Sequence, residues 1–160
     1  MIQCREPSIH MITEEDNSFM QQALELAAAV DPAKTDPNPR VGCVIVSEDQ
    51  VVATGAHLSD GGPHAEVEAF NALGGKRISE GTLYVTLEPC STAGRTGACC
   101  QRIIESGMID RVVIGAIDPN PHHRGKAIEL LKQSGIQVEP GCLADQCEAL
   151  NPEFNRRMAD

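Results

Sequence analysis

Two kinds of hydrophobic spacing alternate along this chain. Over residues 14–30 the apolar side chains recur every three to four positions, which predicts an amphipathic helix. Continuous apolar runs instead predict buried strands, because both faces of such strands are covered. The runs of this kind are 41–47, 51–56, 82–87, 111–117 and 136–139. Further helices are predicted over residues 64–73, 99–106, 126–133 and 143–150.

The order of these elements predicts an α/β fold. The first two strands are separated by a polar turn at 48–50 and form a hairpin. Helices and apolar strands then alternate, and such βαβ units require parallel strands with helices packed on the sheet. We therefore expect a three-layer α/β/α domain with a mixed sheet of about five strands. It is expected to occupy residues 13–160, after an N-terminal arm of residues 1–12.

Composition and charge narrow the class of partner. The chain has 160 residues with no Trp, one Tyr and three Phe, so the core must be largely aliphatic. Its formal net charge of −10 repels phosphate backbones and anionic membranes, which favours a small-molecule substrate over nucleic acid or a membrane surface. Seven cysteines without a secretion signal predict reduced thiols and a cytoplasmic location.

The candidate chemistry lies in two short segments. His64 and Glu66 follow a Gly-Pro pair, and Cys90 and Cys99 flank a glycine-rich stretch after the strand 82–87. One histidine and two thiolates suit Zn²⁺ and leave a fourth tetrahedral position open, which is typical of a catalytic rather than a structural site. Two thiolates cancel the zinc charge and acidify a bound water only weakly. A separate base is therefore expected, and Glu66 is the candidate.

Simpler interpretations of these residues exist. A lone His-x-Glu pair is common, and free cysteines are often plain buried thiols. The joint pattern is more specific, because zinc deaminases carry His-x-Glu followed by Pro-Cys-x-x-Cys. Here eight residues rather than two separate Cys90 from Cys99, which indicates a subgroup of these enzymes.

The chain closely resembles the pyrimidine deaminase domain of the bifunctional riboflavin-biosynthesis deaminase–reductases. The stretches that carry the resemblance are 37–46 (PNPRVGCVIV), 62–69 (GPHAEVEA), 82–99, 118–121 (DPNP) and 135–154. The resemblance implies hydrolytic removal of an exocyclic amine from a diaminopyrimidinone ribotide, an early intermediate between GTP and riboflavin. Because the chain ends at Asp160, without a reductase domain, we expect a stand-alone deaminase or one half of a split pair.

By matched position the resemblance implies a role for each site residue. His64, Cys90 and Cys99 would bind one catalytic zinc ion, and Glu66 would be the general acid–base. The substrate-binding positions would be Asn38, Ala65, Thr92, Arg95, Asp118 and Asn120. The chain departs from the family at Thr92, where a substrate-facing histidine is usual, and at Gly97-Ala98, where two prolines are usual. These changes leave the spacing of the predicted zinc ligands intact. They affect the stretch that is expected to decide which substrate binds.

Three alternatives remain open at this point. The chain could deaminate another free base, nucleoside or pterin-like ring, and the altered stretch 92–98 favours considering this. Editing of tRNA or DNA is disfavoured by the acidic charge. A non-catalytic zinc-stabilised interaction module needs no Glu66. Relatives of this fold usually assemble, so a homodimer or homotetramer is expected, and a separate reductase is a candidate partner.

Overall fold

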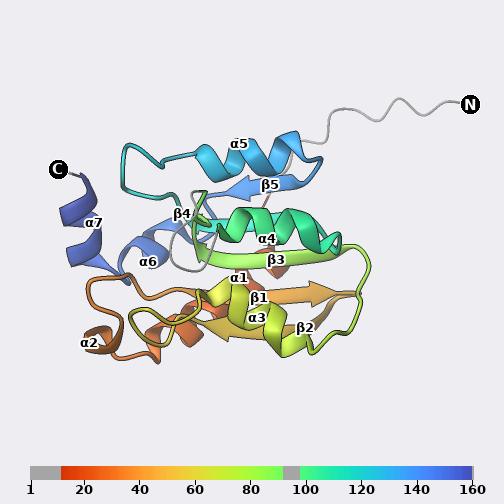
Figure 1. Cartoon of the computed structure of the whole chain (residues 1–160), viewed down its shortest axis with the longest axis horizontal. Coiled ribbons are helices and arrows are strands. Elements are labelled where there is room, and N and C mark those ends of the chain that lie inside the picture. Colours follow the sequence, from red (N-terminus) through yellow and green to blue (C-terminus); the bar gives the residue numbers. More distant parts are fainter. Residues whose placement is uncertain (1–11, 92–97, 160) are drawn as a thin grey trace, which may run out of the picture.

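The centre of the molecule is a five-stranded sheet with the strand order β2-β1-β3-β4-β5, in a computed structural model that describes residues 12–91 and 98–159 (Figure 1). The strands are β1 (Gly42–Ser47), β2 (Gln50–Ala56), β3 (Gly81–Leu87), β4 (Ile109–Ala116) and β5 (Gln137–Pro140). β1 pairs antiparallel with β2 and β3, whereas β3, β4 and β5 are parallel to one another. The prediction of a mixed sheet of about five strands is therefore confirmed.

Helices cover both faces of this sheet. They are α1 (Glu14–Ala28), α2 (Pro32–Thr35), α3 (Ala65–Leu73), α4 (Cys99–Ser106), α5 (Lys126–Gln133), α6 (Ala144–Glu148) and α7 (Pro152–Ala159). α3, α4 and α5 pack on one face, and α1 and α6 pack on the other (Figure 1). Each face buries its own apolar cluster, and the largest fully buried side chains are aliphatic, as the composition requires: Met20, Ile45, Leu83, Ile103, Ile114 and Leu131.

The hydrophobic pattern predicts neither α2 nor α7. α2 is only four residues long and depends on local signals, since the Asp31 side chain accepts a hydrogen bond from the Ala33 N–H and Pro32 occupies the first turn. α7 buries no residue fully and has only two large apolar side chains, Phe154 and Met158, which are too few to predict a helix by their spacing. α1 also ends two residues before the predicted end at Val30, in the turn that leads to Pro32.

The carboxyl ends of β2, β3 and β4 lie together at one end of the sheet. β3 and β4 run in the same direction, and Leu87 near the end of β3 pairs with Ala116 at the end of β4. β1 runs the other way, so Gly42 at its start lies beside Ala56 at the end of β2. In open α/β sheets ligands bind in the crevice at the carboxyl ends of the strands. We therefore expect a binding site at this end of the sheet.

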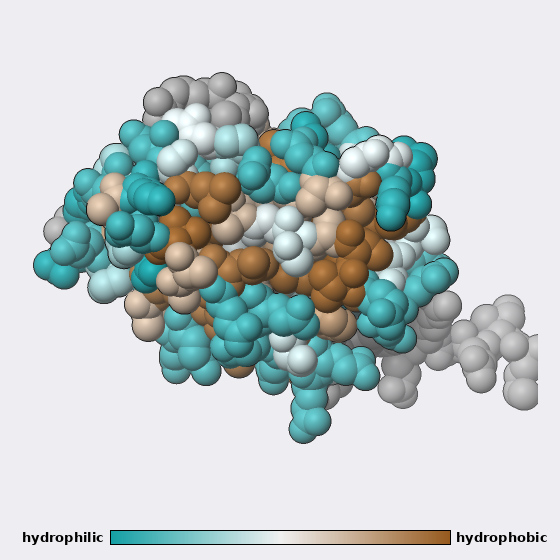
Figure 2. Space-filling model, turned by 90° about the horizontal axis from the view of Figure 1, so that it is seen from below, coloured by the Kyte–Doolittle hydropathy of each residue, from teal (hydrophilic) through white to brown (hydrophobic). Residues whose placement is uncertain are grey.

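One side of the sheet is bounded by the edge strand β2. Seen from this side, an apolar band crosses the surface between hydrophilic borders (Figure 2). Val51 and Val52 of β2 are 38% and 37% exposed, and β2 carries neither the charged residues nor the proline that commonly protect an edge strand. Within the described ranges, no helix is long and apolar enough to cross a bilayer.

Candidate active site

Two helix starts and one strand end bring the predicted ligands together. His64 is the N-cap residue of α3, and Glu66 lies in the first turn of the same helix. Cys90 follows β3 by three residues, and Cys99 is the first residue of α4. His64 and Cys99 are 35 positions apart in the chain, yet the His64 Nδ1 atom lies 3.1 Å from the Cys99 Sγ atom.

The geometry of these three side chains fits a zinc ion. Their ligand atoms all lie within 4.8 Å of one another, and the His64 Nδ1 atom is 3.7 Å from the Cys90 Sγ atom. In a tetrahedral zinc site a nitrogen and a sulfur ligand lie about 3.6 Å apart, given usual bond lengths of about 2.0–2.1 and 2.3 Å. The two nitrogen–sulfur distances bracket this value, and one imidazole with two thiols is a donor set that zinc prefers.

Hydrogen bonds favour the thiolate form of Cys90. The backbone N–H of Cys99, at the start of α4, donates to the Cys90 Sγ atom at 3.0 Å. Hydrogen bonds with the Cys99 side chain and with His64 lower the pKa of Cys90 to about 4. The same hydrogen bond with Cys90, together with burial, raises the pKa of Cys99. These hydrogen bonds thus favour the thiolate of Cys90, which is the form of cysteine that binds a metal ion.

Glu66 is a buried carboxyl group beside these ligands. Its residue is only 3% exposed, and burial raises its pKa to about 7, with the charge of Cys90 adding to the rise. A bound divalent cation acts in the opposite direction, because positive charge favours the carboxylate. Glu66 is thus a group that can hold or release a proton near neutral pH.

A cavity of about 220 Å³ lies beside this cluster at the strand ends. His64, Glu66 and Cys90 lie in its wall beside the end of β3. The complete lining is Asn38, Pro39, Val41, His57, His64, Ala65, Glu66, Leu87, Glu88, Cys90, Asp118 and Phe154. Pockets for drug-sized ligands commonly measure about 300–1,000 Å³, so this cavity suits a single ring with its substituents.

The predicted substrate-binding residues divide into three groups. Asn38, Ala65 and Asp118 line the cavity. Asn120 is absent from the lining given above, and its Oδ1 atom accepts a hydrogen bond from the His122 N–H within its own loop. Thr92 and Arg95 lie outside the described residues. The substrate-binding roles of all six residues stay predictions.

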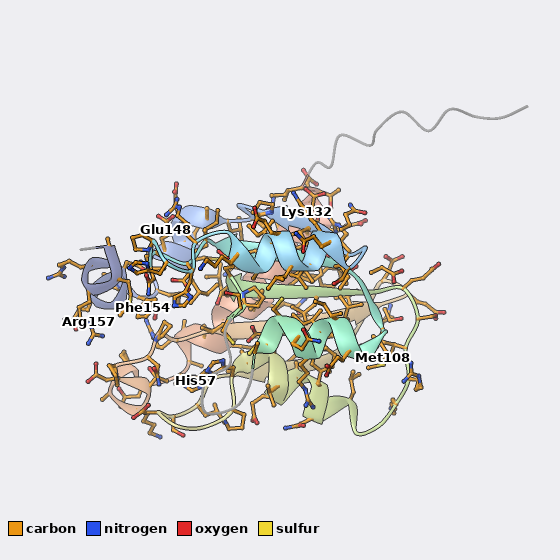
Figure 3. All side chains as sticks on the ribbon, turned by 45° about the horizontal axis from the view of Figure 1, so that its top comes forward. His57, Met108, Lys132, Glu148, Phe154 and Arg157 are labelled. Atoms are coloured by element: carbon orange, nitrogen blue, oxygen red, sulfur yellow. The ribbon has the colours of Figure 1, made fainter. Side chains whose placement is uncertain are left out.

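The structure adds two lining residues that the sequence pattern does not single out. His57 follows β2 and is 3% exposed, and its Nδ1 atom lies 2.9 Å from the Pro63 carbonyl oxygen. Its Nε2 atom is buried without a hydrogen-bond partner among the described residues. Its position after a strand that ends at this end of the sheet was the available signal. Phe154 belongs to the unpredicted α7 and lies at the same end of the domain as His57 (Figure 3).

Glu88 joins the end of β3 to the loop that carries Asp118. Its Oε1 atom accepts hydrogen bonds from the backbone N–H groups of Asp118 at 3.2 Å and Gly125 at 3.0 Å. Its Oε2 atom accepts from the Ala127 N–H at 3.1 Å. This buried carboxylate therefore holds both ends of the loop 118–125 against the cavity wall.

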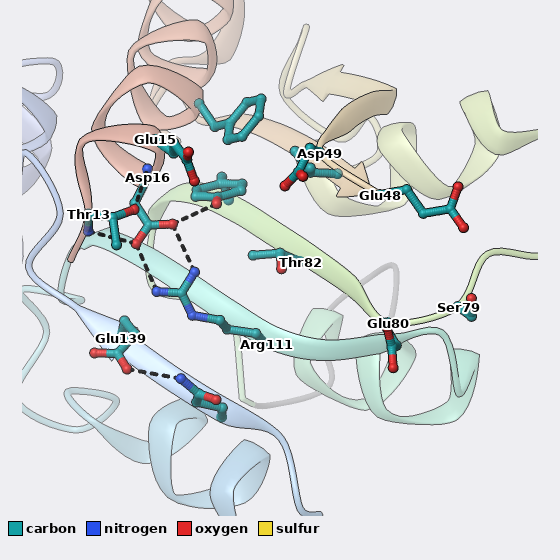
Figure 4. A pocket seen from close by; sticks show the side chains of 14 residues that line it. Thr13, Glu15, Asp16, Glu48, Asp49, Ser79, Glu80, Thr82, Arg111 and Glu139 are labelled. Atoms are coloured by element: carbon teal, nitrogen blue, oxygen red, sulfur yellow. Dashed lines mark hydrogen bonds and ion pairs between the residues drawn. The ribbon is translucent and has the colours of Figure 1, made fainter. Parts of the chain in front are cut away.

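A second cavity, of about 530 Å³, lies toward the opposite ends of β3 and β4 (Figure 4). Six of its fourteen lining residues are acidic. One of them, Asp16, accepts hydrogen bonds from both Nη atoms of Arg111 at 2.8 Å and from the Tyr84 hydroxyl at 2.7 Å. Burial by itself raises the pKa of Asp16, but these hydrogen bonds and one from the Thr13 N–H outweigh it and hold the pKa well below its usual range. The network ties α1 to β3 and β4, so it has a structural explanation.

Comparison with known proteins agrees with this geometry. Residues 13–116 match the family model of the cytidine and deoxycytidylate deaminase zinc-binding region. The matched range includes His64, Glu66, Cys90 and Cys99. The chain therefore belongs to the zinc-dependent cytidine and deoxycytidylate deaminase family, and it is a deaminase with a zinc-binding region.

Several relatives define the part of this family that the chain resembles. It is 44% identical over 143 residues to a diaminohydroxyphosphoribosylamino-pyrimidine deaminase of Buchnera aphidicola, covering 89% of this chain and 95% of that protein. It is 45% identical over 144 residues to the riboflavin biosynthesis protein RibD of Aquifex aeolicus, covering 90% of this chain and 40% of that protein. A solved structure of Acinetobacter baumannii RibD matches 91% of this chain and 40% of its own, with a TM-score of 0.85 and 43% identity. The chain thus spans about two fifths of the length of these RibD proteins.

Proposed function

We propose that this chain catalyses the hydrolytic deamination of the diaminohydroxyphosphoribosylamino-pyrimidine of riboflavin biosynthesis. The observation that carries the proposal is the 44% identity with a Buchnera deaminase of that name over 95% of the relative's length. The His64, Cys90 and Cys99 cluster beside Glu66 supports it, because these residues match the chemistry that such a reaction needs. The proposed reaction type thus rests on the site residues, and the proposed substrate rests on the similarity to the Buchnera deaminase.

The reaction exchanges an exocyclic amine for oxygen. Water adds its oxygen to the ring carbon, the carbon–nitrogen bond breaks, and ammonia leaves. When bound, zinc supplies a nucleophile at neutral pH by lowering the pKa of water. Glu66 accepts the proton of the attacking water and returns protons to the ring nitrogen and to the departing amine. Its place in the cavity wall supports this role, because the carboxyl group borders the space that a substrate ring would occupy.

The size of the cavity indicates which part of the substrate it holds. About 220 Å³ accommodates the pyrimidine ring, so the ribose phosphate must lie toward the opening. Asn38 and Asp118 both line the cavity, and the Asn38 Nδ2 group donates to the Asp60 Oδ1 atom at 2.8 Å. This hydrogen bond orients the Asn38 side chain and directs its carbonyl oxygen, as an acceptor, away from Asp60. An amino group of the ring is a suitable donor for that oxygen.

The decisive experiment compares Glu66→Gln with the parent in an ammonia-release assay. Positioned acid–base catalysis contributes about 10²–10⁴-fold, so the variant is expected to lose turnover by at least that factor while keeping its zinc. Glu68→Gln, two residues further along α3 and outside the cavity lining, is the matched control and should retain parental turnover. Parental ammonia release by Glu66→Gln would refute the mechanism.

A substrate panel separates the proposal from its nearest alternative. We expect turnover of the pyrimidine that carries ribose phosphate, and little turnover of free bases, nucleosides or pterin-like rings. A preference for any of the latter would replace the proposed substrate and leave the deaminase chemistry in place.

We also infer a homo-oligomer, formed through the apolar edge of β2. Val51 and Val52 are exposed there on a strand without edge protection. Light scattering should show a dimer or tetramer that Val51→Lys with Val52→Lys converts to monomers; a parent that is already monomeric would contradict this.

A separate reductase is the proposed functional partner, because the RibD relatives extend well beyond the matched region. The six cysteines among the described residues are in the thiol form rather than in disulfides, which favours a reducing, cytoplasmic setting.

A further inference from the structure

Phe154 differs in its surroundings from the other aromatic residues. The chain contains four aromatic side chains. The rings of Phe19 and Tyr84 pack together with centroids 5.3 Å apart, and Phe70 is 8% exposed in the core beneath Arg102. Phe154 is only half-buried, has no aromatic partner among the described residues, and lines the cavity that holds Glu66. Its ring therefore lines the site and belongs to neither of the two buried apolar clusters.

The helix that carries Phe154 is held mainly by polar contacts. α7 has eight residues and buries none of them, and a helix this short is marginal without outside support. Asn151, which precedes α7, accepts from the Arg40 N–H at 2.7 Å and donates from its Nδ2 group to the Arg40 carbonyl at 2.9 Å. Arg157 donates to the Pro37 carbonyl at 3.0 Å. These contacts attach α7 to the segment 37–40, which also supplies Asn38 to the cavity.

The two attachment points bracket Phe154 along the helix. Asn151 lies three residues before it and Arg157 three residues after it, so both contacts restrain the same turns of α7. Phe154 also lines the neighbouring groove between α7 and the segment 32–40, which places it at the boundary between cavity and surface. An aromatic ring in this position can cover one face of a bound heteroaromatic ring, and stacking of this kind tolerates different bases.

We propose that Phe154 is a substrate-binding residue that packs against the pyrimidine ring, and that Asn151 is a positioning residue for it. This inference rests on the proposed function, because it assumes an aminopyrimidine in the cavity. It assigns the C-terminal helix a part in substrate affinity, apart from the zinc ligands and Glu66.

The test uses the zinc-loaded full chain, five test variants and one control variant. Phe154→Ala and Phe154→Leu remove the aromatic ring, and Leu keeps most of the apolar volume. Phe154→Tyr keeps the ring, Asn151→Ala removes the anchor, and the double variant Asn151→Ala with Phe154→Ala tests whether the two act together. Arg156→Ala, at an exposed position of α7 outside the cavity lining, is the matched control. The readouts are zinc content, kcat, KM and the affinity for the deaminated product by calorimetry.

Loss of the Phe154 ring is expected to weaken the binding of substrate and product and to leave kcat unchanged. Stacking of a base on an aromatic side chain corresponds to about a 5- to 150-fold effect, so KM and the product dissociation constant should rise by that factor in Phe154→Ala and Phe154→Leu. kcat and zinc content should stay close to parental values, since the contact is the same before and during reaction. Phe154→Tyr should bind as the parent does, and Asn151→Ala should raise KM without adding to the effect of Phe154→Ala.

Each contrary result overturns a defined part of the inference. Parental KM and product affinity in Phe154→Leu would show that the ring does not contact the substrate. A joint fall in zinc content and kcat would show a structural role, and additive effects of the two alanine variants would remove Asn151 as its positioning residue. If the parent fails to deaminate the ribotide, the proposed function is wrong. The same variants are then compared on the aminopyrimidine that the substrate panel identifies, which decides the role of Phe154 separately.

Discussion

Replacement of Glu88 by glutamine should damage both stability and the site. Glu88 is 5% exposed and accepts three backbone hydrogen bonds, from the N–H groups of Asp118, Gly125 and Ala127 at 3.0–3.2 Å. Both of its oxygens are used. A glutamine side chain has only one acceptor oxygen, so its amide N–H₂ must face at least one of these backbone donors.

The magnitude follows from the hydrogen bonds that change. A hydrogen bond to a charged group contributes about 1.5–3 kcal/mol, and a buried donor left without a partner costs about 1–3 kcal/mol. Allowing for partial relaxation of the loop, we expect Glu88→Gln to lower the free energy of unfolding by about 2–4 kcal/mol. With a urea dependence of about 2 kcal/mol per molar, the midpoint should fall by about 1–2 M.

Urea titration followed by circular dichroism, with zinc present throughout, measures this change. The matched control is Glu25→Gln, at an exposed position of α1, which should unfold within about 0.5 kcal/mol of the parent. Because the loop 118–125 loses its anchor, KM should rise together with the loss of stability. A Glu88→Gln midpoint equal to that of the control would show that the three hydrogen bonds do not hold this loop, and the reasoning would fail.

Two further predictions concern the scaffold. The pKa of Asp16 is held well below its usual range, although its burial acts to raise it, because hydrogen bonds from Arg111 and other donors prevail; its stabilising effect is therefore complete above the unfolded pKa of about 4 and is lost as pH falls below it. The stability difference between the parent and Asp16→Asn, measured by urea titration from pH 7 to pH 3, should shrink at low pH, and a constant difference would contradict this. Gly55→Ala should lower the thermal midpoint and the zinc content together, since its Cβ atom would lie 2.4 Å from the Ala65 carbonyl oxygen and push away the helix that carries Glu66. Unchanged zinc binding in a Gly55→Ala protein of parental stability would show that this close approach is not required.

The sequence predicts most elements because their hydrophobic patterns are strong. The bounds of α4 and α5 agree with the prediction, since a clear apolar stripe leads to a glycine or a polar stop in each. Other elements shift by one or two residues, as for β4, which begins at Ile109 rather than at residue 111. α7 escapes prediction because its contacts are made by Asn151 and Arg157 with backbone groups more than a hundred residues away. Contacts of this kind leave no periodic signal in the sequence.

The zinc ligands could be predicted from the sequence for a similar reason. A histidine at a helix start, a cysteine after a strand and a cysteine opening the next helix are local signals, and the requirements of zinc link them. The distance of 3.1 Å between the His64 and Cys99 ligand atoms was not readable, because it depends on how α3 and α4 pack against one face of the sheet. Nothing local distinguishes His57 from a surface histidine. Only its place after β2, at the edge where β3 and β4 end, brings it into the cavity.

The sequence by itself therefore determined the class of chemistry, since His64, Glu66, Cys90 and Cys99 are the residue types that zinc-dependent deamination needs, in an order that few other sites share. The tertiary structure decided what surrounds that chemistry. Glu88 holds the loop of Asp118, and Phe154 reaches the cavity from the last helix, through contacts between segments far apart in the chain. The physical reason is that metal affinity resides in the atoms of a few side chains, whereas the shape of a cavity resides in the packing of the elements around it.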